Sequence, residues 1–418
     1  MQRERSTAAE RTAPTTPSGT ADILLDDAAR TSSIGAAMRQ LFGSWGYGEV
    51  IPPIFERVET LLAGGIHPDW MVRFADPGGD ALALRPDFTT QIARVVATRL
   101  REQPKPLRLF YVGSVVRRPK PSVGRRAEFA QAGIELVGSS EPTADAEVVA
   151  IAIEALTGLG IDDVQVHLGQ SAFLRGIIET TRLLDADVRG IEELLDRRDR
   201  AALERRLADL ALPARCAQRI LACLELCGGD DILDRAATLV DSRTSEAALA
   251  NLAHVCATLR DYGLEDRIVI DLAEVRGLGY YTGLMIEGFS RSLAAPILEG
   301  GRYDDLVGRF GHPCPAIGCA LDVARIASVL ASREAPPPRV DALVRYRPQQ
   351  RAHAFALAAS LRTQGRCVEL EVADRTEAEA TAYARRRGIV EVQTVGADGT
   401  RIVDVASDTV GGGTPWID

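Results

Sequence analysis

The chain has 418 residues, of which 46% are hydrophobic and 26% charged, and its formal net charge is −9. This composition is typical of a soluble globular protein, and the length favours two or three domains over a single core. The acidic balance gives no general attraction to a polyanion, so we expect no nucleic-acid partner. Seven cysteines without a Cys-x-x-Cys pair do not form a disulfide framework or a zinc-ribbon spacing, and we expect no metal site.

The beginning of the chain predicts where the protein resides. Residues 1–17 are polar and rich in Ser, Thr and Pro, and we expect a disordered tail there without the apolar stretch of a signal peptide. No later apolar run approaches the roughly 18 residues that a membrane span requires. We therefore expect a cytoplasmic protein without a membrane partner.

Residues 18–170 alternate between helical and strand patterns. Apolar residues recur at helical spacing over 21–45, after which two glycines break the helix and an extended Pro-Pro segment follows. Residues 81–100 run from a strand into a helix, with Pro86 and Asp87 at the expected helix start. Two strands joined by a basic turn, and then a helix, are predicted over 107–118, 127–138 and 145–160.

Residues 171–265 change character, because they show long Leu/Ala/Arg/Glu/Asp periodicity and no convincing strand. We expect an inserted helical domain, with Cys216, Cys223 and Cys227 at helical spacing on its core face. Strand patterns and a closing helix return over 267–277, 280–289, 297–307 and 320–331.

The segment 334–340, "EAPPPRV", reads as a linker, and alternating strands and helices beyond it predict a small α/β domain with helices at 350–364 and 376–387. The predicted fold class is α+β, with an antiparallel sheet flanked by helices. The expected divisions are a core, a helical insertion and a C-terminal domain, over 18–170 with 266–334, 171–265 and 335–418.

Two polar groups of residues carry candidate chemistry. Asp87, Thr89 and Thr90 lie at a strand-to-helix junction, where short oxygen-bearing side chains either cap the helix or bind a ligand. Gln131 and Glu135 are four residues apart in one strand and therefore share a face. That face is either solvated or the lining of a polar pocket.

A third group is the segment "EVRGLGYYTG", in which Arg276 precedes paired tyrosines, Tyr280 and Tyr281, among glycines that allow close backbone approach. It is either an aromatic hairpin that fills a core or one wall of a pocket. A plain hairpin core does not need the arginine. The glycine-rich "EGGRYDD" follows about ten residues later.

The order and spacing of these segments resemble the histidine–tRNA ligases, which are class II aminoacyl-tRNA synthetases, over about residues 18 to 335. "EVIPPIFE" is similar to class II motif 1, with Pro53 at the dimer interface, while "VVRR" with "AEFAQAGIE" is similar to motif 2 and "PAIGCALDVAR" to motif 3. "LRPDFTTQ" and "RGLGYYTG" resemble the two histidine-recognition segments.

The resemblance implies a histidine pocket. It places Asp87, Thr89 and Gln131 around the α-ammonium group of the ligand. Glu135 and Tyr281 then meet the imidazole, beside Tyr280. Arg117 and Arg276 face the carboxylate. These pairings are chemically sound, since an ammonium needs acceptors and a carboxylate suits an arginine fork.

The nucleotide part of the synthetase signature is broken. Pro119 stands where motif 2 has a glutamate that accepts from the adenine amino group. In motif 3, Asp322 replaces a glycine and Ala324 replaces an acid, so a nucleotide is crowded and meets extra negative charge. Gly279 also replaces an aspartate of the second histidine segment. We therefore expect no catalytic residues and no cofactor.

A core that keeps an amino-acid pocket and loses its nucleotide site resembles the regulatory subunits of ATP phosphoribosyltransferase. That resemblance implies assembly with a short-form catalytic subunit, four of each, on synthetase-like dimers, with histidine as an effector. It also implies a role in the first step of histidine biosynthesis. A divergent histidine–tRNA ligase and a synthetase-like transferase are the alternatives.

Overall fold

A computed structural model of the chain describes residues 15–118, 126–179, 181, 183–275, 280–332, 340–406 and 410–411. The chain divides into two compact units, residues 1–333 and residues 334–418.

The first unit is built on a nine-stranded sheet that is mainly antiparallel, with parallel pairing only between β1 and β5 and between β7 and β9 among the described strands. This sheet with its flanking helices confirms the expected α+β class. In spatial order the strands are β1 (Gly48–Glu49), β5 (Leu107–Val116), β6 (Glu128–Val137), β12 (Ala316–Asp322), β11 (Leu293–Arg302), β10 (Leu284–Ser290), β7 (Gln165–Gln170), β9 (Ile268–Asp271) and β8 (Cys227–Gly228).

Residues of the central strands alternate between the two faces of the main sheet. Ala132, Ile134 and Leu136 of β6 belong to the larger core, together with helices α1 (Leu25–Ser44), α4 (Pro142–Thr157) and α11 (Val323–Ala331). Because neighbouring residues of a strand point to opposite faces, Gln131 and Glu135 must point away from that core. The opposite face carries the candidate site.

A small subdomain covers that opposite face. Helix α3 (Thr89–Arg99) packs with η3 (Val307–Phe310) and α2 (Val58–Ala63), and their apolar residues share a second core with Tyr111 and Val115 of β5. A three-stranded sheet completes the subdomain, in the order β2 (Phe55–Arg57), β4 (Ala81–Leu84) and β3 (Arg73–Ala75), with η1 (Pro68–Trp70) before β3.

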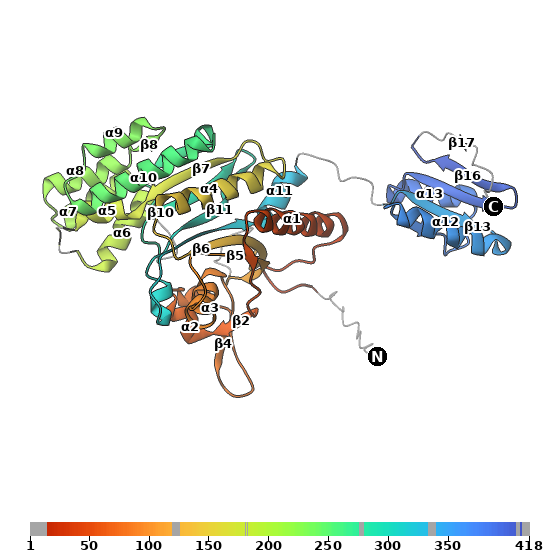
Figure 1. The fold of residues 1–418 in the computed structure, drawn as a ribbon, viewed down its shortest axis with the longest axis horizontal. Helices are drawn as coiled ribbons and strands as arrows, with labels where there is room; N and C mark the ends of the chain where they lie inside the picture. The colour runs from red at the N-terminus through yellow and green to blue at the C-terminus, as the bar shows by residue number, and fades with distance from the viewer. Residues whose placement is uncertain are drawn as a thin grey trace, which may run out of the picture. The chain divides into compact units, whose positions relative to one another are not determined.

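The segment between β7 and β9 is helical, as expected, and its helices gather beside the β7 end of the sheet (Figure 1). The expectation of no strand there was wrong, because Cys227–Gly228 pair with β9 at the edge of the main sheet. Cys227 is accordingly exposed, whereas Cys216 and Cys223 are buried on the helical core face. The helices are α5 (Ser171–Ile178), α6 (Asp185–Asp196), α7 (Arg200–Asp209), α8 (Ala214–Cys223), α9 (Asp231–Ala237) and α10 (Arg243–Asp261), followed by η2 (Glu265–Arg267).

The second unit contains a five-stranded sheet with separate small cores on its two faces. Helix α12 (Arg351–Thr363) packs on β13 and β14, and α13 (Glu377–Arg387) packs on β15. Both helices lie within two residues of their predicted bounds. The remaining elements are β14 (Val368–Leu370), β13 (Ala342–Tyr346), β15 (Glu391–Gly396), β16 (Gly399–Asp404), β17 (Val410–Gly411) and η4 (Pro348–Gln350).

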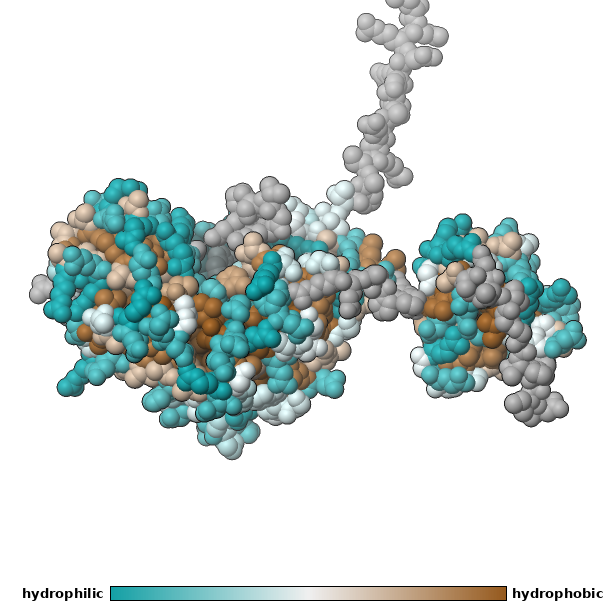
Figure 2. All heavy atoms as spheres, turned by 90° about the horizontal axis from the view of Figure 1, so that it is seen from above, coloured by the Kyte–Doolittle hydropathy of each residue, from teal (hydrophilic) through white to brown (hydrophobic). Residues whose placement is uncertain are grey.

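The surface of the described part of the chain is mixed in character. Figure 2 shows hydrophilic residues interspersed with smaller hydrophobic areas on the visible face of each unit. None of the helices in the described ranges combines the length and apolarity needed to span a bilayer.

Candidate functional site

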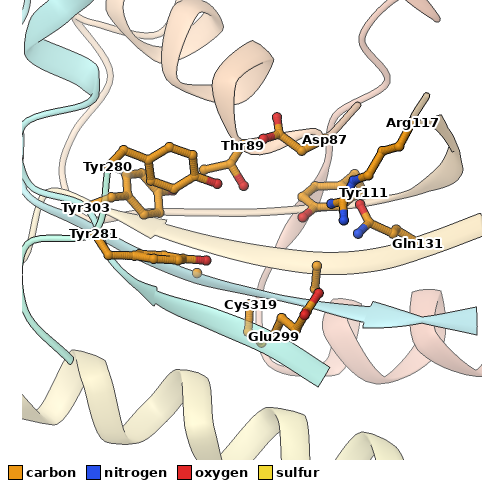
Figure 3. Close-up of a pocket in the computed structure, with 12 residues that line it drawn as sticks. Asp87, Thr89, Tyr111, Arg117, Gln131, Tyr280, Tyr281, Glu299, Tyr303 and Cys319 are labelled. Atoms are coloured by element: carbon orange, nitrogen blue, oxygen red, sulfur yellow. The ribbon is translucent and has the colours of Figure 1, made fainter. Parts of the chain in front are cut away.

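A cavity lies on the face of the main sheet that α3 covers. It encloses about 380 Å³, part of which is open to solvent. Figure 3 shows Tyr280, Tyr281 and Tyr303 gathered at one end, and Asp87, Arg117 and Gln131 with Tyr111 at the other. Its lining residues are Asp87, Thr89, Tyr111, Arg117, Gln131, Tyr280, Tyr281, Glu299, Tyr303, Gly318, Cys319 and Ala320.

The aromatic end is a contiguous group of rings. The ring centroids of Tyr280 and Tyr281 are 5.0 Å apart, and those of Tyr280 and Tyr303 are 5.9 Å apart, both in edge-to-face arrangement. Burial raises the pKa of all three phenols well above the usual value, so their hydroxyls stay neutral and can donate or accept. A planar ligand group with polar edges suits this end of the cavity.

Glu135 lies beneath the cavity rather than among its lining residues, and its side chain is only 1% exposed. Its carboxylate accepts a hydrogen bond from the Thr89 hydroxyl at 2.8 Å and another from the Tyr303 hydroxyl. Burial raises the pKa of Glu135 to about 8, although these hydrogen bonds act in the opposite direction. Gly318 of β12 faces the same carboxylate, and a Cβ there would overlap a carboxylate oxygen of Glu135.

The polar end contains two buried acceptors without partners. Asp87 is 4% exposed and accepts from the Thr90 backbone N–H at 3.3 Å through Oδ1. Its Oδ2, like Oε1 of the 5% exposed Gln131, has no hydrogen-bond partner among the described residues. Asp87 therefore both caps the start of α3 and leaves one oxygen for a ligand. A buried, unpaired acceptor costs about 1–3 kcal/mol, which a ligand with N–H donors can recover.

The charge at this end is arranged around Asp87. Burial raises the pKa of Asp87, and the positive charge of Arg117 opposes that rise. The Nε of Arg117 donates to the Pro86 carbonyl at 2.8 Å, and its guanidinium lies 5.2 Å from the Trp70 ring centroid and 5.3 Å from that of Phe129. Arg117 is thus held in the wall of the cavity by backbone and aromatic contacts.

A second hollow of about 250 Å³ adjoins the first and shares Arg117, Gln131, Glu299 and Ala320 with it. Asp322 caps helix α11 here, since its Oδ1 accepts from the Arg325 N–H at 3.0 Å. Its Oδ2 also pairs with the Arg325 Nε at 3.2 Å. The arginine of the motif 3 segment is therefore engaged by its own chain, and the charged lining of this hollow consists of two carboxylates, Asp322 and Glu299, and two arginines, Arg117 and Arg325.

Six of the eight predicted site residues line the first cavity, namely Asp87, Thr89, Arg117, Gln131, Tyr280 and Tyr281. Glu135 lies directly below them, and Arg276 falls outside the described residues. Sequence reasoning missed Tyr111, Glu299 and Tyr303. The "EGGRYDD" segment contains two of these and was a usable signal, whereas Tyr111 enters only because its strand pairs with β6 opposite Gly133.

No group of three or more His, Cys, Asp and Glu side chains within the described ranges is arranged to hold a metal ion. The side chains that line the cavity offer hydrogen-bonding and ionic groups, which suit a small zwitterion.

Comparisons with known proteins identify the family of this chain. The family model described as histidyl-tRNA synthetase matches residues 19–326. The chain is 38% identical, over 90% of its length and 94% of the relative's, to an ATP phosphoribosyltransferase regulatory subunit from Desulforamulus reducens.

Solved structures show the same fold. An ATP phosphoribosyltransferase regulatory subunit/histidyl-tRNA synthetase from Bacillus halodurans superposes with a TM-score of 0.81 at 27% identity, covering 91% of this chain and 97% of that one. A histidyl-tRNA synthetase from Nostoc gives a TM-score of 0.84 at 24% identity, over 96% and 97% of the two chains, which shows the fold alone. The chain therefore belongs to the histidyl-tRNA synthetase family and, within it, to the ATP phosphoribosyltransferase regulatory subunits.

Proposed function

We propose that this chain assembles with a short-form ATP phosphoribosyltransferase catalytic subunit, enables the first step of histidine biosynthesis, and regulates that step through histidine bound in the cavity. The main support for this proposal is a chemical difference between the two adjoining hollows. One holds unpaired acceptors and tyrosines, and the other is occupied by the Asp322–Arg325 pair. The first suits an amino acid, and in the second Arg325 is paired with Asp322, which weakens the site for a nucleotide.

Histidine fits the distribution of groups in the first cavity. Its ammonium group can donate to the free oxygens of Asp87 and Gln131, which recovers the cost of burying them. Its imidazole edge suits the tyrosine end, where hydroxyl groups and the buried Glu135 lie. Arg117 lines the cavity and can pair with the carboxylate of the ligand. Arg276 is the second cation proposed from the sequence.

The second hollow supports our proposal that the chain does not aminoacylate tRNA. A nucleotide there brings negative phosphates toward Asp322 and Glu299. It must also compete with Asp322 and the Pro296 carbonyl for the guanidinium of Arg325. Together with Pro119 and Ala324 in the sequence, these contacts support a subunit without adenylate chemistry.

The self-dimer is supported by an exposed apolar ridge around the motif 1 segment. Ile51 is 83% exposed, and Ile54, Phe55 and Phe74 are each at least 39% exposed. The Phe55 and Phe74 rings contact each other edge to face from β2 and β3, the strands on either side of β4. Large apolar side chains exposed together mark an interaction site. We propose that two copies bury this ridge, and that the complete assembly contains four copies of each subunit in the cytoplasm.

Reconstitution tests the proposed function. The purified chain is mixed with a short-form catalytic subunit, and the complex is isolated and assayed for ATP phosphoribosyltransferase activity with and without histidine. We expect co-purification, higher activity than the catalytic subunit alone, and inhibition by histidine. Two cavity variants, Tyr281→Phe and Glu135→Ala, should weaken that inhibition. The exposed Glu102→Gln variant is the matched control and should behave like the wild type.

Three results contradict the proposal. Inhibition that is unchanged in both cavity variants removes this cavity from the regulation. Histidine-dependent exchange of pyrophosphate into ATP by the chain alone establishes a working histidine–tRNA ligase site instead. Binding of a different amino acid in preference to histidine indicates the transferase alternative.

A further inference from the structure

The tyrosine wall of the cavity is attached to the helical insertion at two points. The Arg175 Nη2 of α5 donates to the Tyr281 carbonyl at 2.9 Å. Ser171, the first residue of α5, donates to the Gly283 carbonyl through both its backbone N–H, at 3.0 Å, and its hydroxyl, at 3.1 Å. Helix α5 is therefore hydrogen-bonded to the segment that follows Tyr280. A displacement of Tyr280 and Tyr281 must move α5 or break these hydrogen bonds.

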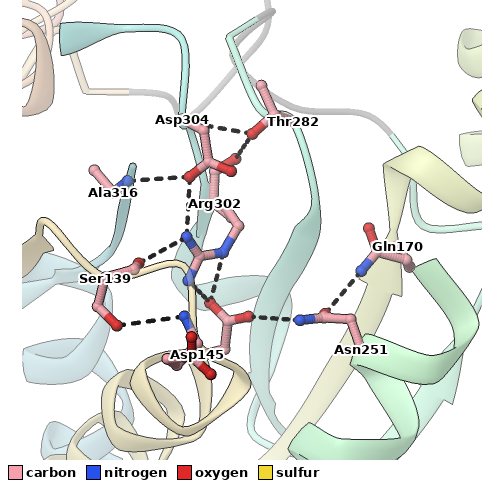
Figure 4. A network of polar contacts seen from close by, with 9 residues as sticks. Ser139, Asp145, Gln170, Asn251, Thr282, Arg302, Asp304 and Ala316 are labelled. Carbon is pink, nitrogen blue, oxygen red and sulfur yellow. Dashed lines mark hydrogen bonds and ion pairs between the residues drawn. The ribbon is translucent and has the colours of Figure 1, made fainter. Parts of the chain in front are cut away.

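A buried polar network provides a second attachment, drawn in Figure 4. At its centre Arg302, 5% exposed, donates to the fully buried Asp145 of α4 through Nε at 2.9 Å and Nη2 at 2.6 Å. The Asn251 amide of α10 donates to the other oxygen of Asp145 at 3.4 Å. Gln170, at the end of β7, donates to Asn251 at 3.1 Å. The network thus joins the main sheet to α10, the longest helix of the insertion.

The same network fixes the cavity wall. Arg302 directly precedes Tyr303, and its carbonyl accepts from the Thr282 N–H at 2.7 Å. The Thr282 hydroxyl accepts from the Asp304 N–H at 3.0 Å, and Asp304 in turn accepts from Arg302 Nη1 at 2.9 Å. A Cβ on Gly283 would meet the Arg302 side chain at 3.2 Å, so there is little slack between them. The hydrogen bonds of the network therefore fix the backbone next to Tyr281 and Tyr303.

The links differ in strength, and this allows them to be separated. The Arg302–Asp145 pair is deeply buried, and removal of either partner leaves an unpaired charge. By contrast, Arg175 is exposed, and Asn251 makes a long hydrogen bond from a half-buried position. The two insertion links can therefore be cut while the central pair stays intact.

We propose that the helical insertion reads the occupancy of the cavity through Arg175 of α5 and Asn251 of α10, which act as positioning residues between the tyrosine wall and the insertion. This inference rests on the proposed histidine cavity and names the element that carries its state toward a partner subunit. A ligand that fixes the tyrosines in one conformation strengthens the hydrogen bonds of Arg175 and Asn251 and so stabilises α5 and α10. Reciprocity then requires that loosening the insertion lower the affinity for the ligand.

Hydrogen exchange of the full-length chain, measured with and without saturating histidine, tests this coupling. We expect histidine to slow exchange in 171–178 and 243–261 of the wild type by at least about fivefold, the lower end of typical coupling between sites. The double variant Arg175→Met/Asn251→Ala should lose most of this protection. Each single variant should lose part of it, and stands in for the double variant if that one does not fold. Arg215→Met, an exposed arginine of α8, is the matched control and should keep the wild-type response.

Calorimetry of histidine binding is run on the same samples to separate the possible failures. Binding without protection of the two helices in the wild type overturns the coupling and leaves the cavity proposal standing. Full protection in the double variant overturns the assignment to Arg175 and Asn251. Absence of histidine binding overturns both the cavity proposal and this inference.

Discussion

The pKa of Glu135 predicts a pH dependence of stability that a single substitution can isolate. The folded chain holds this carboxyl with a pKa of about 8, because it is buried, against a reference value of 4.5. Between these two pH values the folded state binds a proton that the unfolded state has released. The free energy of unfolding therefore falls as pH rises, by at most about 1.4 kcal/mol per pH unit for one group.

From pH 5 to pH 8 this amounts to about 2–4 kcal/mol, since the slope declines as the folded carboxyl begins to ionise. Glu135→Gln removes the titration while keeping an oxygen that can accept from Thr89 or Tyr303. Urea unfolding at pH 5, 6, 7 and 8 measures the effect. We expect the wild type to lose about 2–4 kcal/mol relative to the variant over this range.

Comparison with the variant cancels the other groups that titrate in the wild type. The exposed Glu102→Gln variant is the control and should follow the wild type at every pH. A difference between wild type and Glu135→Gln that stays constant from pH 5 to pH 8 would refute the reasoning, because it means that Glu135 ionises alike in the folded and unfolded chains.

Three further predictions concern the sheet and its ion pair. Gly318→Ala places a Cβ against the Glu135 carboxylate, so we expect a loss of at least about 2 kcal/mol in urea unfolding; an unchanged midpoint contradicts this. Burial and acidic neighbours raise the pKa of Glu287 to about 8. The Glu287→Gln variant should therefore be more stable than the wild type at pH 8 and similar to it at pH 4. Arg302→Met leaves buried Asp145 without its cation and should cost about 3–5 kcal/mol in the same assay; a cost below about 1 kcal/mol shows that water compensates.

The sequence by itself determined the local features of this protein. Helical spacing located α1, α12 and α13, and alternation within one strand placed Gln131 and Glu135 on the same face. These inferences succeed because the helical and strand repeats depend on neighbours within one or two turns or a few alternating positions. The family resemblance then assigned chemistry to residues whose types and spacing it shares, and the family model and the similar regulatory subunits confirmed the family.

Only the tertiary structure decided how deeply each side chain is buried and which residues lie next to it. Glu135 and Gln131 share a face, yet one lies under the cavity and the other lines it, because Thr89 and Tyr303 close over the Glu135 carboxylate from separate elements. Tyr111 and Glu299 meet at the site through the strand order β5-β6-β12-β11, across 188 residues of sequence. Strand β8 forms from two residues in a helical segment because β9 offers an edge to pair with. Such contacts depend on which strands become neighbours, and no local repeat in the sequence carries that information.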